Sequence, residues 1–224
     1  MATAGKRNNM LSILRHVASS AGILTAFAIV GTAMLAATYL VTRPIIAETE
    51  KQAKLALISQ ILPKTLYDND LMKDAAQLPP AQELGSSEPT PVYRALKEGK
   101  PAAAVLEVIA PDGYSGKIRM VVAISANGQI SGVRVVAHNE TPGLGDYIDI
   151  AKNSWIRIFD KKSLSNTSDQ NWKVKKDGGK FEHMAGATIT PRAVVKAVHK
   201  SLKYFAENQD NIFSLPANTQ EQAK

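Results

Sequence analysis

The chain has 224 residues, of which 45% are apolar, and it contains no cysteine. This length allows one medium-sized domain plus a membrane anchor. The lack of cysteine excludes disulfides, thiolate zinc sites and thiolate-bound iron–sulfur clusters, so redox chemistry would need an organic cofactor. The formal charge of +7 leaves only 23 basic against 20 acidic residues after position 43, which argues against nucleic-acid binding. The four earlier basic residues are Lys6, Arg7, Arg15 and Arg43.

An uncharged apolar segment, residues 21–41, follows the basic N-terminus. A helix of this length spans about 30 Å, the thickness of the hydrocarbon core of a bilayer. Three basic residues precede the segment and one follows it, so the positive-inside tendency keeps residues 1–20 in the cytoplasm and places the main domain outside. A cleaved signal peptide is the alternative, but its apolar region would be shorter, and we favour a retained transmembrane helix.

A helical pattern in residues 44–66 predicts a stalk that joins the anchor to the main domain. Pro44 suits the start of its helix and Pro63 suits its end. Apolar residues recur on one face of this helix, and this face serves either the domain core or a neighbouring subunit. They are Leu55, Ile58, Ile61 and Leu62.

The main domain is expected to cover residues 67–213, beginning with an irregular connection up to residue 90 in which Pro and Gly interrupt any period. Four segments then predict strands. Asn127-Gly128, a strong hairpin signal, joins the last two. This pattern predicts an antiparallel sheet flanked by helices, an α+β fold. The four segments are residues 92–96, 103–110, 118–125 and 129–137.

The second half of the domain carries weaker signals. A helix is expected around residues 155–159, which include two aromatic side chains. Residues 161–179 are polar and predict a surface loop, in which Trp172 and Val174 mark a short strand. Residues 214–224 are polar and predict a flexible tail.

The segment with the most functional information is residues 184–192, MAGATITPR. Thr190 is predicted to cap a helix in which Pro191 is the first residue. Thr188 is then expected on an uncrowded turn before a helix N-terminus, which favours a phosphate, with Gly186 at positive φ. The alternative is that this segment forms only a capped turn. The apolar stripe of the helix is expected to be Val194, Val198, Leu202 and Phe205.

A second small-residue loop, ETPGLG at Glu140–Gly145, follows the last predicted strand. Its Pro-Gly-x-Gly pattern can bring backbone N–H groups close to a ligand, although a plain turn is the alternative. The spacing of the four histidines predicts no metal site, and solvated or capping roles are expected for them. Only His183 is left open as a hydrogen-bonding partner for a ligand. The other three are His16, His138 and His199.

Three motifs occur in order after the single apolar span: GYSGKI at Gly113–Ile118, ETPGLG, and AGATITPRAVV at Ala185–Val195. Together they resemble the G subunit of the Rnf (or Rsx) electron transport complex. More distantly, the chain is similar to the C subunit of the Na⁺-translocating NADH:quinone reductase. The resemblance covers nearly the whole chain.

The resemblance implies a bacterial inner-membrane protein with a periplasmic FMN-binding domain. It implies an FMN joined through its phosphate to Thr188, by a separate flavin transferase that uses FAD. The usual Asp of the family's attachment motif is Glu182 here, which keeps the carboxylate and lengthens its reach. Further FMN contacts are expected mainly from backbone groups, not from the carboxylate of Glu140. The residues expected to contact FMN besides Thr188 are Gly186, Ala187, Thr190, Glu140, Thr141, Pro142, Gly143, Leu144 and Gly145.

The leading functional hypothesis is an electron-carrying component of an ion-translocating oxidoreductase complex, which is not expected to be active alone. Its expected partners are the other subunits, the transferase and the lipid bilayer. One uncharged span cannot form an ion path, so other subunits must supply it. The alternatives are a membrane-anchored periplasmic binding or scaffold module without a redox role and a stand-alone flavin reductase.

Overall fold

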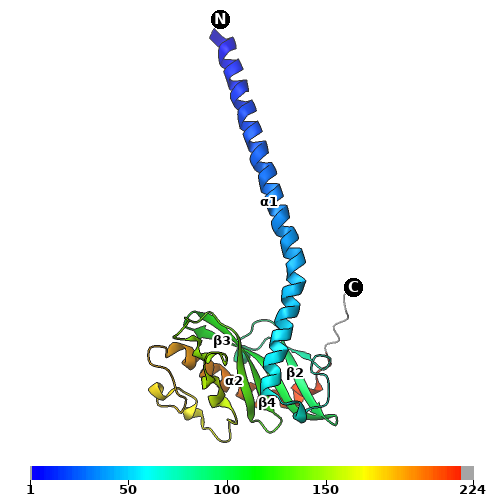
Figure 1. Cartoon of the computed structure of the whole chain (residues 1–224), viewed down its shortest axis with the longest axis vertical. Coiled ribbons are helices and arrows are strands. Elements are labelled where there is room, and N and C mark those ends of the chain that lie inside the picture. Colours follow the sequence, from blue (N-terminus) through cyan, green and yellow to red (C-terminus); the bar gives the residue numbers. More distant parts are fainter. Residues whose placement is uncertain (1, 218–224) are drawn as a thin grey trace. The chain divides into compact units, whose positions relative to one another are not determined.

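The computed structural model describes residues 2–217, with side chains from residue 15 onward (Figure 1). Within the predicted tail, residues 218–224 lie outside this described part. The chain divides into two units, residues 1–53 and residues 54–224. The long helix α1, Ala2–Ile61, contributes to both units.

The first unit consists of α1 up to residue 53 and contains the predicted membrane segment. The stretch Arg15–Ile61 is long and apolar enough to cross a membrane. Large apolar side chains in it, such as Phe27 and Leu35, are exposed, as contact with lipid requires. The helix continues through Pro44, so the prediction of a separate helix starting there was wrong. Proline removes one backbone donor, but its fixed φ is compatible with a helix, and intact turns on both sides maintain the continuity.

The second unit is built on an antiparallel sheet with the strand order β1-β2-β3-β4-β5. The predicted α+β fold with an antiparallel sheet is confirmed, and Gly128 turns the last hairpin at φ +79°. β1 lies in the segment predicted to be irregular, because three residues are too few to show a period; it pairs Ala76 with Val92. The strands are β1 (Ala76–Leu78), β2 (Thr90–Lys97), β3 (Lys100–Gly113), β4 (Gly116–Ser125) and β5 (Ile130–Ala137).

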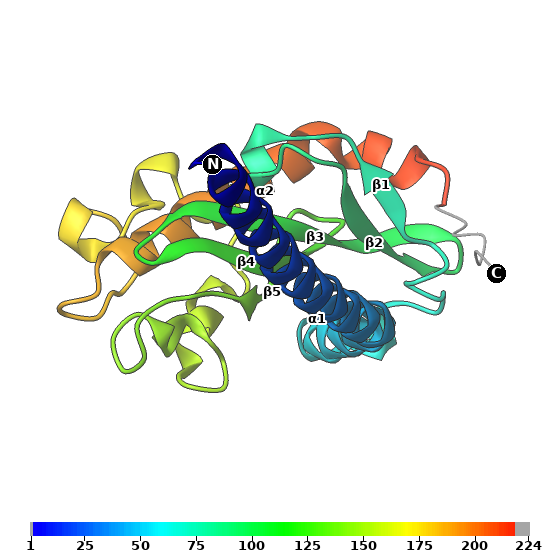
Figure 2. The same cartoon turned by 90° about the horizontal axis from the view of Figure 1, so that it is seen from above.

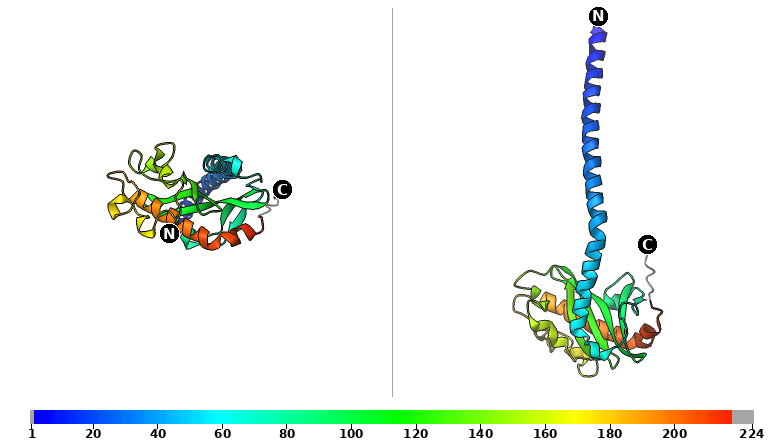
Figure 3. Two further views of the ribbon diagram at one scale, coloured as in Figure 1. Left: turned by 90° about the horizontal axis from the view of Figure 1, so that it is seen from below. Right: turned by 45° about the vertical axis from the view of Figure 1, so that its right-hand side comes forward.

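Helices cover both faces of this sheet (Figures 2 and 3). Helix α2, Ile189–Ser214, packs on one face, and the predicted stripe of Val194, Val198, Leu202 and Phe205 is buried. The last turns of α1 pack on the other face, where Ile58, Ile61 and Leu62 join side chains of β2, β3 and β4 in a second core. The apolar face of the stalk therefore serves the domain core, which decides between the two alternatives.

Short 3₁₀ helices connect the remaining segments. The predicted helix around Trp155 is the 3₁₀ helix η4. Its Phe159 packs with Trp155, Trp172 and Phe181. The predicted short strand near Trp172 is reduced to one isolated bridge between Val174 and Phe181. The 3₁₀ helices are η1 (Lys64–Leu66), η2 (Gln82–Leu84), η3 (Asp146–Ile148), η4 (Ser154–Phe159), η5 (Asp169–Asn171) and η6 (Lys175–Asp177).

The contact between α1 and the sheet depends on Gly132 in β5. A Cβ atom at this position would lie 2.6 Å from Cγ2 and 2.8 Å from Cβ of Ile61. We therefore expect Gly132→Ala to lower the free energy of unfolding by about 1–3 kcal/mol through overpacking, as measured by denaturant unfolding of the full chain in detergent. The double variant with Ile61→Ala should lose less than the two single variants combined. If the stability losses of the two single variants simply add up in the double variant, the contact between Gly132 and Ile61 is contradicted.

Candidate functional site

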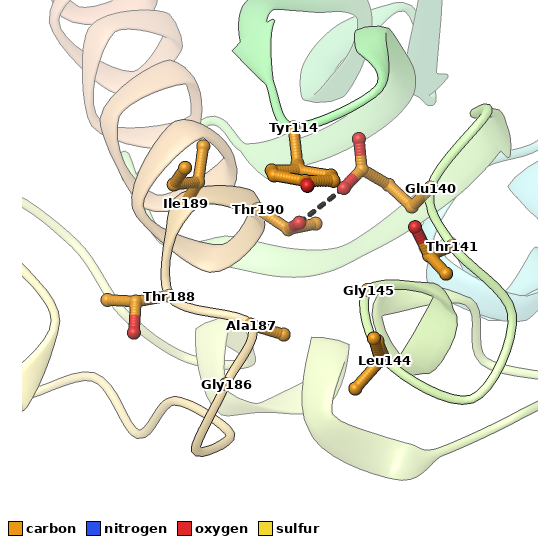
Figure 4. A pocket seen from close by; sticks show the side chains of 10 residues that line it. All are labelled: Tyr114, Glu140, Thr141, Leu144, Gly145, Gly186, Ala187, Thr188, Ile189 and Thr190. Atoms are coloured by element: carbon orange, nitrogen blue, oxygen red, sulfur yellow. Dashed lines mark hydrogen bonds between the residues drawn. The ribbon is translucent and has the colours of Figure 1, made fainter.

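The three sequence motifs meet at one cavity of about 290 Å³ (Figure 4). Its walls come from the turn between β3 and β4, from the loop after β5 and from the start of α2. Two predicted residues, Pro142 and Gly143, belong to the loop but do not line the cavity. The lining residues are Tyr114, Glu140, Thr141, Leu144, Gly145, Gly186, Ala187, Thr188, Ile189 and Thr190.

The start of α2 lies two residues earlier than predicted. The helix begins at Ile189, so Thr188 occupies the N-cap position, and the prediction of Thr190 as the cap was wrong. The carbonyl of Thr188 accepts the N–H of Arg192 at 3.3 Å. Its side chain makes no capping hydrogen bond, and its hydroxyl is directed away from Glu140 and Thr190 (Figure 4). The Thr188 hydroxyl is therefore available for other chemistry.

The turn before Thr188 has the predicted open character. Gly186 has φ +85°, in the left-handed region that glycine adopts without strain, and a Cβ there would meet no atom within 4 Å. The N–H of Ala187 donates to the carbonyl of Met184 at 3.2 Å and closes the turn. A second molecule can therefore approach the backbone on this side of the cavity.

Thr190 instead makes a tertiary contact at the base of the cavity. It is 1% exposed, and its hydroxyl is hydrogen-bonded to the carboxylate of Glu140, which is 4% exposed. The second carboxylate oxygen accepts the backbone N–H of Ser115 at 3.0 Å. The local capping pattern failed because a buried carboxylate 50 residues away offers this hydroxyl a charge-assisted partner.

Two motif glycines leave room for this carboxylate. A Cβ at Gly145 would lie 2.8 Å from Oε2 of Glu140 and 3.0 Å from Oγ1 of Thr190. A Cβ at Gly113 would lie 2.9 Å from the other carboxylate oxygen, Oε1. The Pro-Gly-x-Gly pattern predicts that a ligand can approach the loop after β5. Gly145 of this loop and Gly113 also permit the loops to close around Glu140.

The rim of the cavity is apolar and exposed. Tyr114 is 66% exposed, Leu144 49% and Ile189 46%, and the neighbouring Met184 is 39% exposed. In the described part of the second unit, Leu66 is the only other exposed large apolar side chain of this kind. Sequence reasoning missed Tyr114 and Ile189 as lining residues, although both lie within quoted motifs. An apolar rim over a polar base suits a flat aromatic ligand with polar substituents.

Contacts outside the cavity hold residues 182–192, which include Thr188, in place. Tyr147, whose pKa is raised by burial, accepts the N–H of Met184 at 3.3 Å. Trp155 Nε1 donates to the carbonyl of Glu182 at 2.8 Å, and the Glu182 side chain pairs with Lys175. Arg192 binds Asp177 through two hydrogen bonds of 2.6 and 2.7 Å and lowers the pKa of that carboxyl.

The histidines near the motifs differ in their surroundings. Nδ1 of His138 accepts the N–H of Glu140 at 3.0 Å, which is a capping role. His199 stacks on Trp172, and burial lowers the pKa of its imidazole. Nδ1 of His183 is buried without a partner among the described residues. A ligand contact from His183 therefore stays a prediction.

Comparison with known proteins assigns the chain to a family. Residues 113–203 match the FMN-binding domain, and residues 10–61 match the RnfG N-terminal region. The chain is 45% identical over 196 residues to the G subunit of the ion-translocating oxidoreductase complex of Shewanella baltica, covering 88% of this chain and 92% of the relative. The chain belongs to this family of G subunits. The predicted resemblance and the presence of an FMN-binding domain are thereby confirmed.

Two further G subunits of ion-translocating oxidoreductase complexes show the same extent of similarity. The protein of Aliivibrio fischeri is 42% identical over 206 residues, covering 92% of this chain and 98% of its own length. The protein of Pseudomonas aeruginosa is 44% identical over 200 residues, covering 89% and 94%. The similarity to the family therefore extends over both the apolar N-terminal helix and the domain.

The cavity residues fit the FMN expected of this family. All three walls lie within the segment that matches the FMN-binding domain. The exposed apolar rim suits the isoalloxazine ring, and the open turn at the N-terminus of α2 suits a phosphate. These features come from separate parts of the chain.

Gly145 offers a test of the closure around Glu140, because its φ of −89° is accessible to alanine. We expect Gly145→Ala to lower the free energy of unfolding by about 1–3 kcal/mol, since its methyl group would overlap the Glu140–Thr190 pair. In a double-mutant cycle with Thr190→Ala, we expect coupling of at least about 0.5 kcal/mol. Denaturant unfolding measures both.

Gly143→Ala is the matched control from the same loop. Gly143 has φ +76° and open space around its Cβ position, so this substitution tests backbone strain without a clash. It should not couple to Thr190→Ala. Equal coupling for both glycines would contradict the closure around Glu140.

Proposed function

We propose that this protein carries electrons through an FMN attached covalently to Thr188, within a membrane-bound ion-translocating oxidoreductase complex. One observation carries the choice of residue. Thr188 is half-buried at the edge of the cavity and its hydroxyl makes no capping bond, whereas Thr190 is buried and its hydroxyl is bound to Glu140. Only the first is accessible to a modifying enzyme.

The attachment is a phosphoryl-group transfer that a separate flavin transferase performs with FAD. The Thr188 hydroxyl oxygen attacks the phosphorus on the FMN side of the diphosphate and loses its proton. The bond from this phosphorus to the bridging oxygen breaks, and AMP leaves with the electron pair. The product is a phosphoester between Thr188 and FMN, which makes the chain a phosphoprotein.

The residues of the cavity have separate roles in this proposal. Free N–H groups in the first turn of α2 stabilise the phosphate, and Gly186 and Ala187 leave room for it. Tyr114, Leu144 and Ile189 provide apolar contact for the ring. FMN, when bound, supplies one- and two-electron transfer. A tether keeps the cofactor at high effective concentration outside the cytoplasm.

The membrane anchor defines where this chemistry takes place. The basic residues before the span favour a cytoplasmic N-terminus and a periplasmic domain at a bacterial inner membrane. In this proposal residues 67–213 form the periplasmic domain, together with the last turns of α1. Residues 21–41 carry no charge, so other subunits of the complex provide the ion path.

The direct test is covalent flavin on the denatured protein. The full chain is coexpressed with a flavin transferase, separated on a denaturing gel and viewed under ultraviolet light. We expect fluorescence in the wild-type band and none in Thr188→Ala, because the acceptor hydroxyl is gone. Thr190→Val is the control, and it should keep its fluorescence.

Two outcomes would contradict the proposal. Fluorescence retained in Thr188→Ala and lost in Thr190→Val would move the attachment by two residues. A wild-type band without fluorescence beside an active transferase would favour the scaffold alternative.

A further inference from the structure

Glu140 is placed unusually for a carboxylate. It is nearly fully buried, yet it forms part of the cavity wall next to Thr190 and Gly145. Both of its hydrogen bonds are donated to it, by the hydroxyl of Thr190 and by the N–H of Ser115. The N–H of Ser115 can only donate and the Thr190 hydroxyl can donate, so each oxygen of an ionised carboxylate finds a donor here. The base of the cavity is therefore suited to hold a negative charge.

Among the described residues, no Lys, Arg or His nitrogen forms a salt bridge to Glu140 within 4.0 Å. Two cations of α2 pair with other carboxylates, Arg192 with Asp177 and Lys196 with Asp112. The hydrogen bonds stabilise the carboxylate without removing its net charge. Because protein surroundings screen charge less than water does, its field extends into the cavity.

We infer that Glu140 is a positioning residue whose buried negative charge lowers the reduction potential of the FMN in this cavity. The inference rests on the proposed function. Full reduction of FMN takes up two electrons from an upstream donor and, near neutral pH, one proton from solvent, so the ring gains one negative charge. A fixed negative charge in the wall opposes that gain and favours the oxidised form.

A purely structural role would give a different result. Glu140 links three loops, so its replacement affects stability whether or not its charge acts on the flavin. The reduction potential separates the two roles, because the charge can be removed while the hydrogen bonds are kept. Glu140→Gln removes the charge, and its amide can still accept from Ser115 and donate to Thr190. Asp112→Asn is the control, because it removes a carboxylate that pairs with Lys196 and does not line this cavity.

The experiment is a spectroelectrochemical titration of the flavin-loaded full chain in detergent. For Glu140→Gln we expect the ratio of reduced to oxidised flavin, at the potential where wild type is half reduced, to rise at least tenfold. This corresponds to about 30 mV for a two-electron couple. Asp112→Asn should show no such rise. Thermal unfolding of the same samples reports the structural contribution separately.

The outcomes distinguish this inference from the proposed function. A flavin-loaded Glu140→Gln with an unchanged or lower potential overturns the inference and leaves covalent FMN intact. Wild type that carries no flavin after coexpression with the transferase overturns both. Where Glu140→Gln fails to fold or to carry flavin, the wild-type protein decides by its own reduction potential. Its potential should lie below that of free FMN in the same buffer, and a value at or above it overturns the inference.

Discussion

The hydrogen bond between Thr190 and the buried carboxylate of Glu140 is the contact on which the site depends. It joins the loop after β5 to the first turn of α2, and the Ser115 N–H adds the turn between β3 and β4. Loops that carry function are usually the most mobile parts of a fold. Here one satisfied polar group draws three of them together. Breaking such a network on one side leaves a buried charge without its partner, which is strongly unfavourable.

This site is supported by a sheet that is buried on both faces. Side chains of β3 and β4 alternate between the two faces. Those on one face pack against α2, and those on the other face pack against the last turns of α1. The last turns of α1 are thus part of the folded domain. The polar side of this junction is completed by Glu107, which binds Lys54 and Tyr93. Burial and this carboxylate together raise the pKa of the Tyr93 hydroxyl.

Much of this architecture could be predicted from the sequence because its signals are local. The apolar span, the hairpin at Asn127-Gly128 and the stripe of α2 each follow from spacing alone. The errors arose where tertiary contacts outweigh local preference. Thr190 resembles a helix cap, but its partner is a carboxylate in another loop. Pro44 resembles a helix start, but it lies inside α1, where helical turns on both sides keep the helix continuous. The motifs also identified most of the cavity wall, whereas the function of Gly145 next to Glu140 depends on a fold that spacing does not reveal.

The most direct test of the account is a crystal structure of the flavin-loaded chain. We expect continuous density from Oγ1 of Thr188 to the FMN phosphate, with the ring against Tyr114 and Leu144. We also expect the carboxylate of Glu140 to keep its hydrogen bonds to Thr190 and Ser115 beneath the ring. Density for the phosphoester on another residue, or a ring that lies outside this cavity, would contradict it.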